Sequence, residues 1–237
     1  MSLGVNEEMP VLKNNRLSSG IPDLDIIVEG GYLNPGNVMM MGPGGIEKNA
    51  LAYHFAAAAP QTENAYIICA GHSPNDVKDK ANSIGINLNK DNIKFIDCYT
   101  VTLGSSEVKP TEKIRVVGGP SALNDLSLTI NEVIAENTGK KIRIIFDTLS
   151  TFVLYNQKDS IRKFLNLIEG RLKGVGATTI YLVDEGVHDK QTISLLLQGM
   201  DSVYMISDNS SGRVTLTVPD LDMLIPIKVG PTGVVIL

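Results

Sequence analysis

The sequence has few cysteines, no excess of basic residues and no long apolar run. Its two cysteines, Cys69 and Cys98, lie in separate apolar segments and form no C-x-x-C pair. This usage favours buried free thiols in a reducing, cytoplasmic location. The 21 lysines and arginines are outnumbered by 26 aspartates and glutamates, which gives a net charge of −5. Nucleic-acid binding is therefore not expected of the isolated chain, because it normally requires a basic surface.

The apolar segments are too short to cross a membrane. None approaches the roughly 20 apolar residues that a spanning helix needs, so no membrane partner is expected. Residues 1–10 are polar and acidic, which predicts no secretory signal. With 237 residues, 43% of them hydrophobic, the chain has enough apolar side chains for one large core. We expect an N-terminal tail over residues 1–15 and a single domain over residues 16–237.

Strand-like and helix-like segments alternate along most of the chain. Continuous apolar runs predict strands over residues 37–41, 65–70, 93–97, 141–147 and 177–183. Helical spacing predicts helices over residues 47–59, from residue 73, over 123–134 and over 158–173. Apolar strands separated by helices are typical of an α/β protein whose parallel sheet is covered on both faces. Short strands after residue 198 predict antiparallel additions at the C-terminal edge, and residues 99–119 predict a long surface loop.

A glycine-rich turn joins the first long strand to the following helix. Its sequence is Gly42-Pro43-Gly44-Gly45-Ile46-Glu47-Lys48-Asn49. A phosphate loop has the form G-x-x-x-x-G-K-S/T between a strand and a helix. Lys48 is in register with that form, but Glu47 replaces the last glycine and Asn49 replaces the hydroxyl residue. The alternative interpretation is that Gly42 to Gly45 form only a tight strand-to-helix turn, with no role in binding.

Both replacements alter the chemistry that such a loop provides. Backbone N–H groups and the helix N-terminus normally face an anionic phosphate, where the Glu47 carboxylate adds negative charge and bulk. Asn49 offers an amide where magnesium usually receives a hydroxyl. If nucleotide binds, the expected ligands are Gly42, Gly44, Gly45, Lys48, Asn49 and Asp147. We expect no cofactor, and ATP with Mg²⁺ stays as the alternative.

Two further segments carry a resemblance to a known family. Upstream of the loop stand Arg16-Leu17-Ser18-Ser19-Gly20-Ile21-Pro22-Asp23-Leu24-Asp25, then Gly30-Gly31 and Pro35-Gly36. About one hundred residues after the loop stand Ile144-Ile145-Phe146-Asp147-Thr148-Leu149-Ser150. From Arg16 to Val235 the chain resembles KaiC-like and RadA-like (RadB-like) members of the RecA superfamily. The resemblance implies a three-layer P-loop NTPase fold, a mostly parallel sheet and side-by-side assembly with itself or a related protein.

The chain departs from that family at positions tied to ATP hydrolysis. KaiC-like ATPases commonly have two glutamates after the strand that follows the phosphate-loop helix. Here Cys69-Ala70-Gly71-His72-Ser73 follows that strand, without the two glutamates. His72 can in principle accept a proton, but a solvated side chain without a role is the interpretation we favour. The family's late Lys-x-Arg pair corresponds to the acidic residues 218–223. We therefore assign no catalytic residue.

Four carboxylates are expected near the loop: Glu47, Asp147, Asp184 and Glu185. They suggest a hard-cation site, although solvated loop residues are the interpretation we favour, and no metal site is assigned. We also predict that Lys48 pairs with Asp147, directly or through water. Under that prediction, Glu47→Gly alone restores little nucleotide binding, and adding Asn49→Thr restores more.

The remaining candidate motifs have structural explanations. Gly71-His72-Ser73-Pro74-Asn75 imitates G-x-S-x-G without its last glycine, and Ser73 is better explained as a helix N-cap. His54, His72 and His188 lack zinc-ligand spacing. The methionines at 39–41 are expected in a strand core.

Two functions follow. The favoured one is a non-hydrolysing pseudo-ATPase that acts through protein contacts, made by the sheet edge or by an apolar patch at residues 9–12. The alternative is a nucleotide-binding protein or ATPase with a variant loop, related to recombination or signalling.

Overall fold

The core of the protein is one large twisted sheet. The computed structural model describes residues 15–104, 109–208, 213–219, 221 and 223–237. Within them the sheet has the order β12-β11-β10-β9-β3-β8-β7-β4-β5-β6. The parallel part comprises β3 (Gly36–Gly42), β4 (Asn64–Cys69), β5 (Ile93–Asp97), β6 (Ile114–Val116), β7 (Ile142–Asp147), β8 (Thr178–Asp184) and β9 (Ser202–Asp208).

Three antiparallel strands extend this sheet at the C-terminal edge: β10 (Val214–Thr217), β11 (Leu224–Gly230) and β12 (Gly233–Ile236). A separate two-stranded sheet pairs β1 (Arg16–Leu17) with β2 (Tyr32–Leu33). The predicted α/β architecture, mostly parallel with antiparallel additions at the C-terminal edge, is confirmed.

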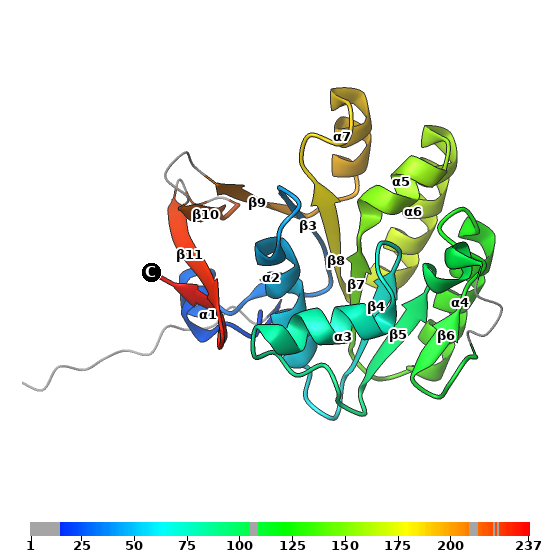
Figure 1. The fold of residues 1–237 in the computed structure, drawn as a ribbon, viewed down its shortest axis with the longest axis horizontal. Helices are drawn as coiled ribbons and strands as arrows, with labels where there is room; N and C mark the ends of the chain where they lie inside the picture. Colours follow the sequence, from blue (N-terminus) through cyan, green and yellow to red (C-terminus); the bar gives the residue numbers. More distant parts are fainter. Residues whose placement is uncertain (1–14, 105–108, 209–212, 220, 222) are drawn as a thin grey trace, which may run out of the picture.

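Helices cover both faces of the sheet, which makes three layers (Figure 1). They are α1 (Pro22–Ile27), α2 (Ile46–Ala57), α3 (Pro74–Ser83), α4 (Leu123–Glu136), α5 (Leu149–Tyr155), α6 (Lys158–Gly174) and α7 (Lys190–Leu197). One apolar core lies under α1, α2, α3 and the C-terminal strands, and the other lies under α4–α7. Met39 and Met40 are fully buried and point into opposite cores, as expected for a strand covered on both faces.

The predicted loop over residues 99–119 contains more structure than expected. A short 3₁₀ helix, η1 (Thr100–Leu103), begins it, and β6 lies near its end. Ser73 is the predicted N-cap of α3: its Oγ accepts from the Asp76 N–H at 3.2 Å, and the Asp76 carboxylate accepts from the Ser73 N–H at 3.0 Å. Among the described residues, no helix combines the length and apolar character needed to cross a bilayer.

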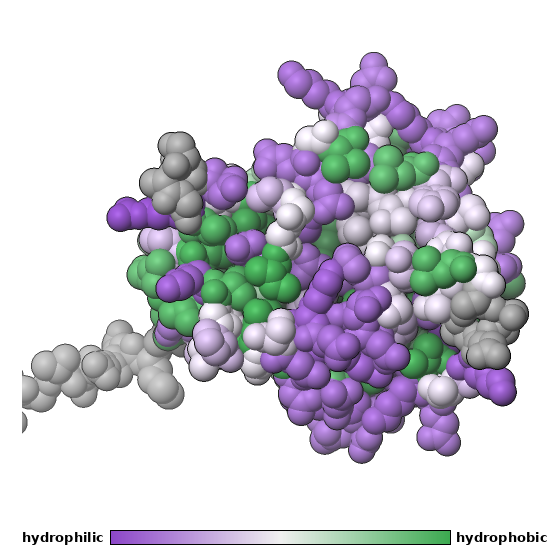
Figure 2. All heavy atoms as spheres, viewed as in Figure 1, coloured by the Kyte–Doolittle hydropathy of each residue, from purple (hydrophilic) through white to green (hydrophobic). Residues whose placement is uncertain are grey.

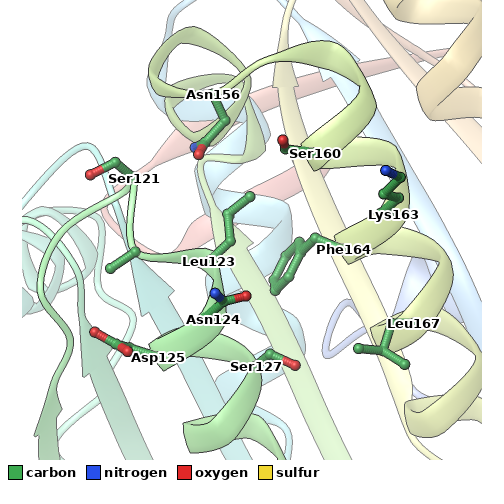
Figure 3. A pocket seen from close by; sticks show the side chains of 11 residues that line it. Ser121, Leu123, Asn124, Asp125, Ser127, Asn156, Ser160, Lys163, Phe164 and Leu167 are labelled. Atoms are coloured by element: carbon green, nitrogen blue, oxygen red, sulfur yellow. The ribbon is translucent and has the colours of Figure 1, made fainter.

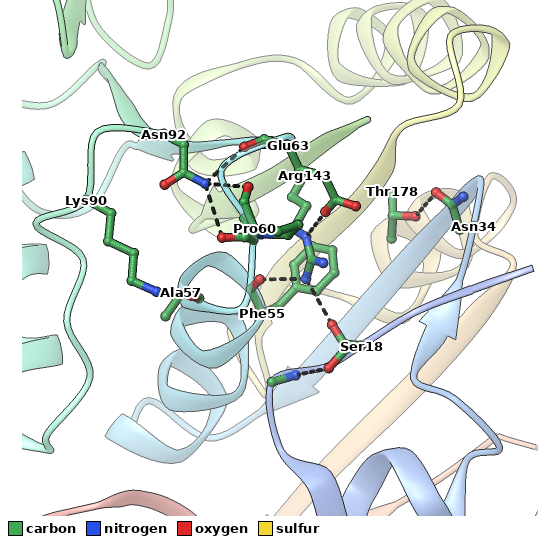
Figure 4. A network of polar contacts seen from close by, with 12 residues as sticks. Ser18, Asn34, Phe55, Ala57, Pro60, Glu63, Lys90, Asn92, Arg143 and Thr178 are labelled. Atoms are coloured by element: carbon green, nitrogen blue, oxygen red, sulfur yellow. Dashed lines mark hydrogen bonds and ion pairs between the residues drawn. The ribbon is translucent and has the colours of Figure 1, made fainter. Parts of the chain in front are cut away.

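A buried charged network fixes the base of the sheet and was not predicted from the sequence (Figure 4). Arg143 on β7 donates from Nε to Glu63 Oε2 at 2.9 Å, and from Nη1 to the carbonyls of Ser18 and Phe55, both at 2.9 Å. Its guanidinium also stacks over the Phe55 ring. The network ties the entry segment and α2 to β7, the strand that ends at Asp147.

Candidate functional site

The phosphate-loop segment lies where the sequence predicted it, between β3 and α2. Gly42 ends β3, and Gly45 is the N-cap of α2 without a side-chain cap. A Cβ on Gly42 would lie 2.8 Å from the Ile206 carbonyl oxygen, so glycine lets β9 approach. The Glu47 carboxylate folds back over the loop, with Oε2 2.5 Å from the Cβ position of Gly45. An acidic group therefore lies beside the loop's N–H groups.

Lys48 is almost fully buried, with 2% of the residue exposed, and forms an ion pair with Asp184. Its Nζ also donates to the Val183 carbonyl at 3.3 Å and to the Gly42 carbonyl at 3.5 Å. The prediction that Lys48 pairs with Asp147 is thus wrong for the direct contact. The reason is strand order: β8, which ends at Asp184, lies between β3 and β7, so its carboxylate is nearer to the loop.

Asp147 is buried at the end of β7 and is engaged by two other side chains. Its Oδ1 accepts from Asn49 Nδ2 at 3.0 Å, and its Oδ2 accepts from the Tyr53 hydroxyl at 3.0 Å. Burial raises the pKa of Asp147, while His72 and the Tyr53 hydrogen bond oppose the rise. Burial also raises the pKa of Tyr53 far above its usual range, so the phenol stays protonated and donates. Sequence reasoning missed Tyr53.

The residues after Asp147 hold Asp184 in place. The Thr148 hydroxyl donates to the Leu182 carbonyl at 2.8 Å, and the backbone N–H of Asp184 donates to Ser150 Oγ at 2.8 Å. These hydroxyls link the ends of β7 and β8. The carboxylate that pairs with Lys48 is therefore positioned by its neighbours.

A pocket of about 390 Å³ opens over these groups. It is lined by Gly44, Gly45, Ile46, Lys48, Asn49, His72, Lys80, Asp147, Thr148 and Asp184. The structure thus brings together all the expected nucleotide ligands except Gly42, which does not line the pocket.

Of the four carboxylates expected near the loop, Asp147 and Asp184 line this pocket. Glu47 and Glu185 do not line the pocket, and Glu185 is exposed as a loop residue. Asp184 is paired with Lys48, and 26% of its side chain stays exposed. No group of three or more histidine, cysteine, aspartate or glutamate side chains suited to a metal occurs in the part of the chain that the structure describes. The ring atom His72 Nδ1 is buried without a hydrogen-bond partner among those residues.

A larger pocket, of about 540 Å³, lies between α4 and α6 (Figure 3). Serine and asparagine side chains form much of its wall, and Phe164 and Leu167 line its apolar side. Its charged groups, Asp125 and Lys163, are exposed. The pocket shares no residue with the phosphate-loop site, so it adds nothing to the chemistry of that site.

Comparisons with known proteins agree with this geometry. A model of the KaiC ATPase family matches residues 17–207. The structure is similar to the crystal structure of a KaiC-like protein from the hyperthermophilic archaeon Pyrococcus horikoshii OT3, with a TM-score of 0.69 and 19% sequence identity. That similarity covers 94% of this chain and 98% of the archaeal chain, and at this identity it supports the fold alone. No curated protein matches the sequence.

Proposed function

This chain belongs to the KaiC ATPase family, and we propose that within it the chain is a pseudo-ATPase that keeps the fold but does not hydrolyse ATP. The observation that carries the proposal is the ion pair between Lys48 and Asp184. A phosphate group must displace Asp184 to reach Lys48. Lys48 is buried, and its ammonium group also donates to the Gly42 and Val183 carbonyls, so the internal partners compete with phosphate for the same charge.

Asp147, the carboxylate expected to approach a magnesium ion, is also engaged by the protein. Magnesium in nucleotide sites takes oxygen ligands, from carboxylates, phosphates and water. Both carboxylate oxygens of Asp147 accept hydrogen bonds from the protein, and Asn49 directs its amide N–H, not an oxygen, toward Asp147. This arrangement satisfies Asp147 without a cation and supports weak or absent magnesium dependence.

The segment after β4 also lacks the pair of glutamates that the family commonly uses to polarise the attacking water. Phosphoryl transfer depends on positioned charges and an oriented water molecule. After β4 the chain places Ala70, Gly71 and His72 where the family commonly has glutamates. The favoured role is therefore contact with another protein, either a second copy or a related RecA-like protein.

Calorimetry with ATP, in the presence and absence of magnesium, tests the proposal together with a turnover assay. We expect no tightening of ATP binding by magnesium. We expect ATP turnover no faster than that of Lys48→Ala. Magnesium-dependent turnover that disappears in Lys48→Ala or Asp147→Asn would overturn the pseudo-ATPase assignment.

A nucleotide-binding protein is the second candidate, because the pocket of about 390 Å³ stays open above Lys48, Asn49 and Asp147. In that case Lys48 leaves Asp184 when phosphate enters. Tight ATP binding without turnover distinguishes this nucleotide-gated function from an ATPase, since binding alone needs no water-activating acid. A role in recombination or signalling belongs to this candidate.

A further inference from the structure

Four buried side-chain oxygens far from the phosphate loop have no hydrogen-bond partner among the described residues. They are Asn37 Oδ1, Glu169 Oε1, Thr179 Oγ1 and Tyr181 Oη. None of these residues is more than 5% exposed. A buried polar group without a hydrogen bond destabilises the fold, so four together call for an explanation.

The four oxygens belong to one place in the core. Asn37 on β3 is the register partner of Thr179 on β8, and Tyr181 follows two residues later on the same face. Glu169 approaches from α6, and a Cβ on Gly199 would lie 1.9 Å from its Oε2. Asn37 Nδ2 donates to the Gly199 carbonyl at 3.1 Å. Gly199 therefore links the two sides of the cluster.

The electrostatics support the same proximity. Burial raises the pKa of Tyr181 well above its usual value, the nearby Glu169 carboxylate adds to the rise, and a close contact with the Thr179 hydroxyl, which falls short of ordinary hydrogen-bond geometry, opposes it. The Tyr181 phenol is therefore protonated and has an O–H to donate. The other Glu169 oxygen, Oε2, lies 4.0 Å from Arg162 Nη1, whereas Oε1 is buried without a partner among the described residues.

The donors and acceptors match one small molecule. The Asn37 amide oxygen only accepts, a Glu169 carboxylate oxygen accepts, and the hydroxyls of Thr179 and Tyr181 each carry a proton to donate. A water molecule donates two hydrogen bonds and accepts two, and buried waters commonly bridge such orphaned groups. We propose that a single internal water molecule binds at this cluster and joins α6 to β3 and β8.

A bound cation fits the same groups less well. It leaves the protons of the two hydroxyls without acceptors, and the Arg162 guanidinium already supplies positive charge beside Glu169. The proposed water has a structural consequence for the site above it. It fixes the starts of β3 and β8, the strands that end at the phosphate loop and at Asp184. The proposal stands independently of whether the protein binds ATP.

An atomic-resolution crystal structure of the unmodified protein tests the proposal directly. We expect one water oxygen at hydrogen-bond distance, roughly 2.7–3.2 Å, from at least three of the four side-chain oxygens. Direct hydrogen bonds from the two hydroxyls to the Asn37 and Glu169 oxygens, with no water between them, would refute it. So would an ion that changes scattering when thallium replaces sodium in the crystal.

Oxygen-17 relaxation dispersion, which counts long-lived internal waters, provides a test in solution. The double variant Thr179→Val with Tyr181→Phe keeps the side-chain shapes but removes both donors, so the count should fall by one. Thr178→Val is the matched control, because that hydroxyl bonds instead to the Leu33 carbonyl at 3.0 Å. An unchanged count in a folded double variant contradicts the proposal. If the double variant does not fold, the crystal structure of the unmodified protein decides.

Discussion

Lys48 carries a positive charge that the protein neutralises internally, and Asp184 is the group that does so. Asp184→Asn removes that charge and leaves Lys48 buried without a carboxylate. We expect this variant to unfold about 3 kcal/mol more easily than the unmodified protein, the magnitude typical of a broken buried pair. Phosphate or ATP should then bind at least about tenfold more tightly, a gain of roughly 1.4 kcal/mol, because the anion takes the place of Asp184.

Glu185→Gln is the matched control for this change. It removes the same charge from the adjacent, exposed residue, which does not contact Lys48. Chemical denaturation and phosphate titration should leave Glu185→Gln close to the unmodified protein. Equal affinity gains in both variants would show that general charge repulsion, not the ion pair, limits anion binding.

At this scale the sequence predicted which residues gather at the site better than it predicted their pairing. Lys48, Asn49 and Asp147 line one pocket, as expected. We predicted the wrong carboxylate as the partner of Lys48, because the order of strands across a sheet cannot be read from their order along the chain. Tyr53 was missed, although its spacing of four residues from Asn49 places both on one face of a helix. That spacing was the available signal.

At the scale of elements, the C-terminal hairpin shares an apolar core with α2, and a histidine of α2 adds a hydrogen bond to it. The backbone N–H of Val234 donates to His54 Nε2 at 2.9 Å. Gly233 has a left-handed backbone with φ +87°, and a Cβ there would lie 2.1 Å from His54 Nε2. Gly233→Ala should therefore destabilise the fold by about 2 kcal/mol or more.

Gly230→Ala serves as the control in the same hairpin. A Cβ on Gly230 meets no atom within 4 Å, and its backbone is not left-handed. Denaturant unfolding should place this variant within about 0.5 kcal/mol of the unmodified protein. A Gly233→Ala variant as stable as Gly230→Ala would contradict the docking described here.

The same histidine makes the hairpin sensitive to pH. Burial lowers the pKa of His54 below its usual value, so on acidification the unfolded chain takes up a proton before the folded protein does. The free energy of unfolding should fall as the pH drops below about 6.5, the ordinary value for histidine. His54→Gln should show a smaller loss between pH 7.5 and pH 5.5 in thermal unfolding. An identical loss in both proteins would exclude His54 as the cause.

Long elements were predictable, and short ones were not. Continuous apolar runs located β3, β4, β5, β7 and β8, and helical spacing located α4 and α6, because each extends over enough residues for a period to appear. The strand β6 has three residues and α5 has seven, too few to show one. The helix α7 was also missed. The Arg143–Glu63 pair could not be predicted for another reason, because its two residues are 80 positions apart in the sequence.

At the scale of the whole molecule, the sheet ends in two unlike edges. One edge is β6, and the other is β12, the last of the antiparallel strands. Apolar surface gathers over the C-terminal strands (Figure 2), where Leu224 is 67% exposed and Leu237 is 71% exposed. Exposed apolar groups at a sheet edge favour association with another chain. This supports, as a proposal, the sheet edge as the contact surface of a pseudo-ATPase.

The final prediction is that the protein self-associates through this edge. Light scattering should give a mass above that of the monomer, and Leu224→Glu should lower it by placing a charge in the contact. Leu154→Glu is the control, because Leu154 is equally exposed, at 65%, but lies on α5.

The apolar patch at residues 9–12 lies outside the described residues, and deletion of residues 1–15 tests it separately. A monomeric mass for the unmodified protein would contradict self-association. A related RecA-like protein would then be the expected partner. If the deletion lowers the mass but Leu224→Glu does not, the N-terminal segment, not the sheet edge, makes the contact.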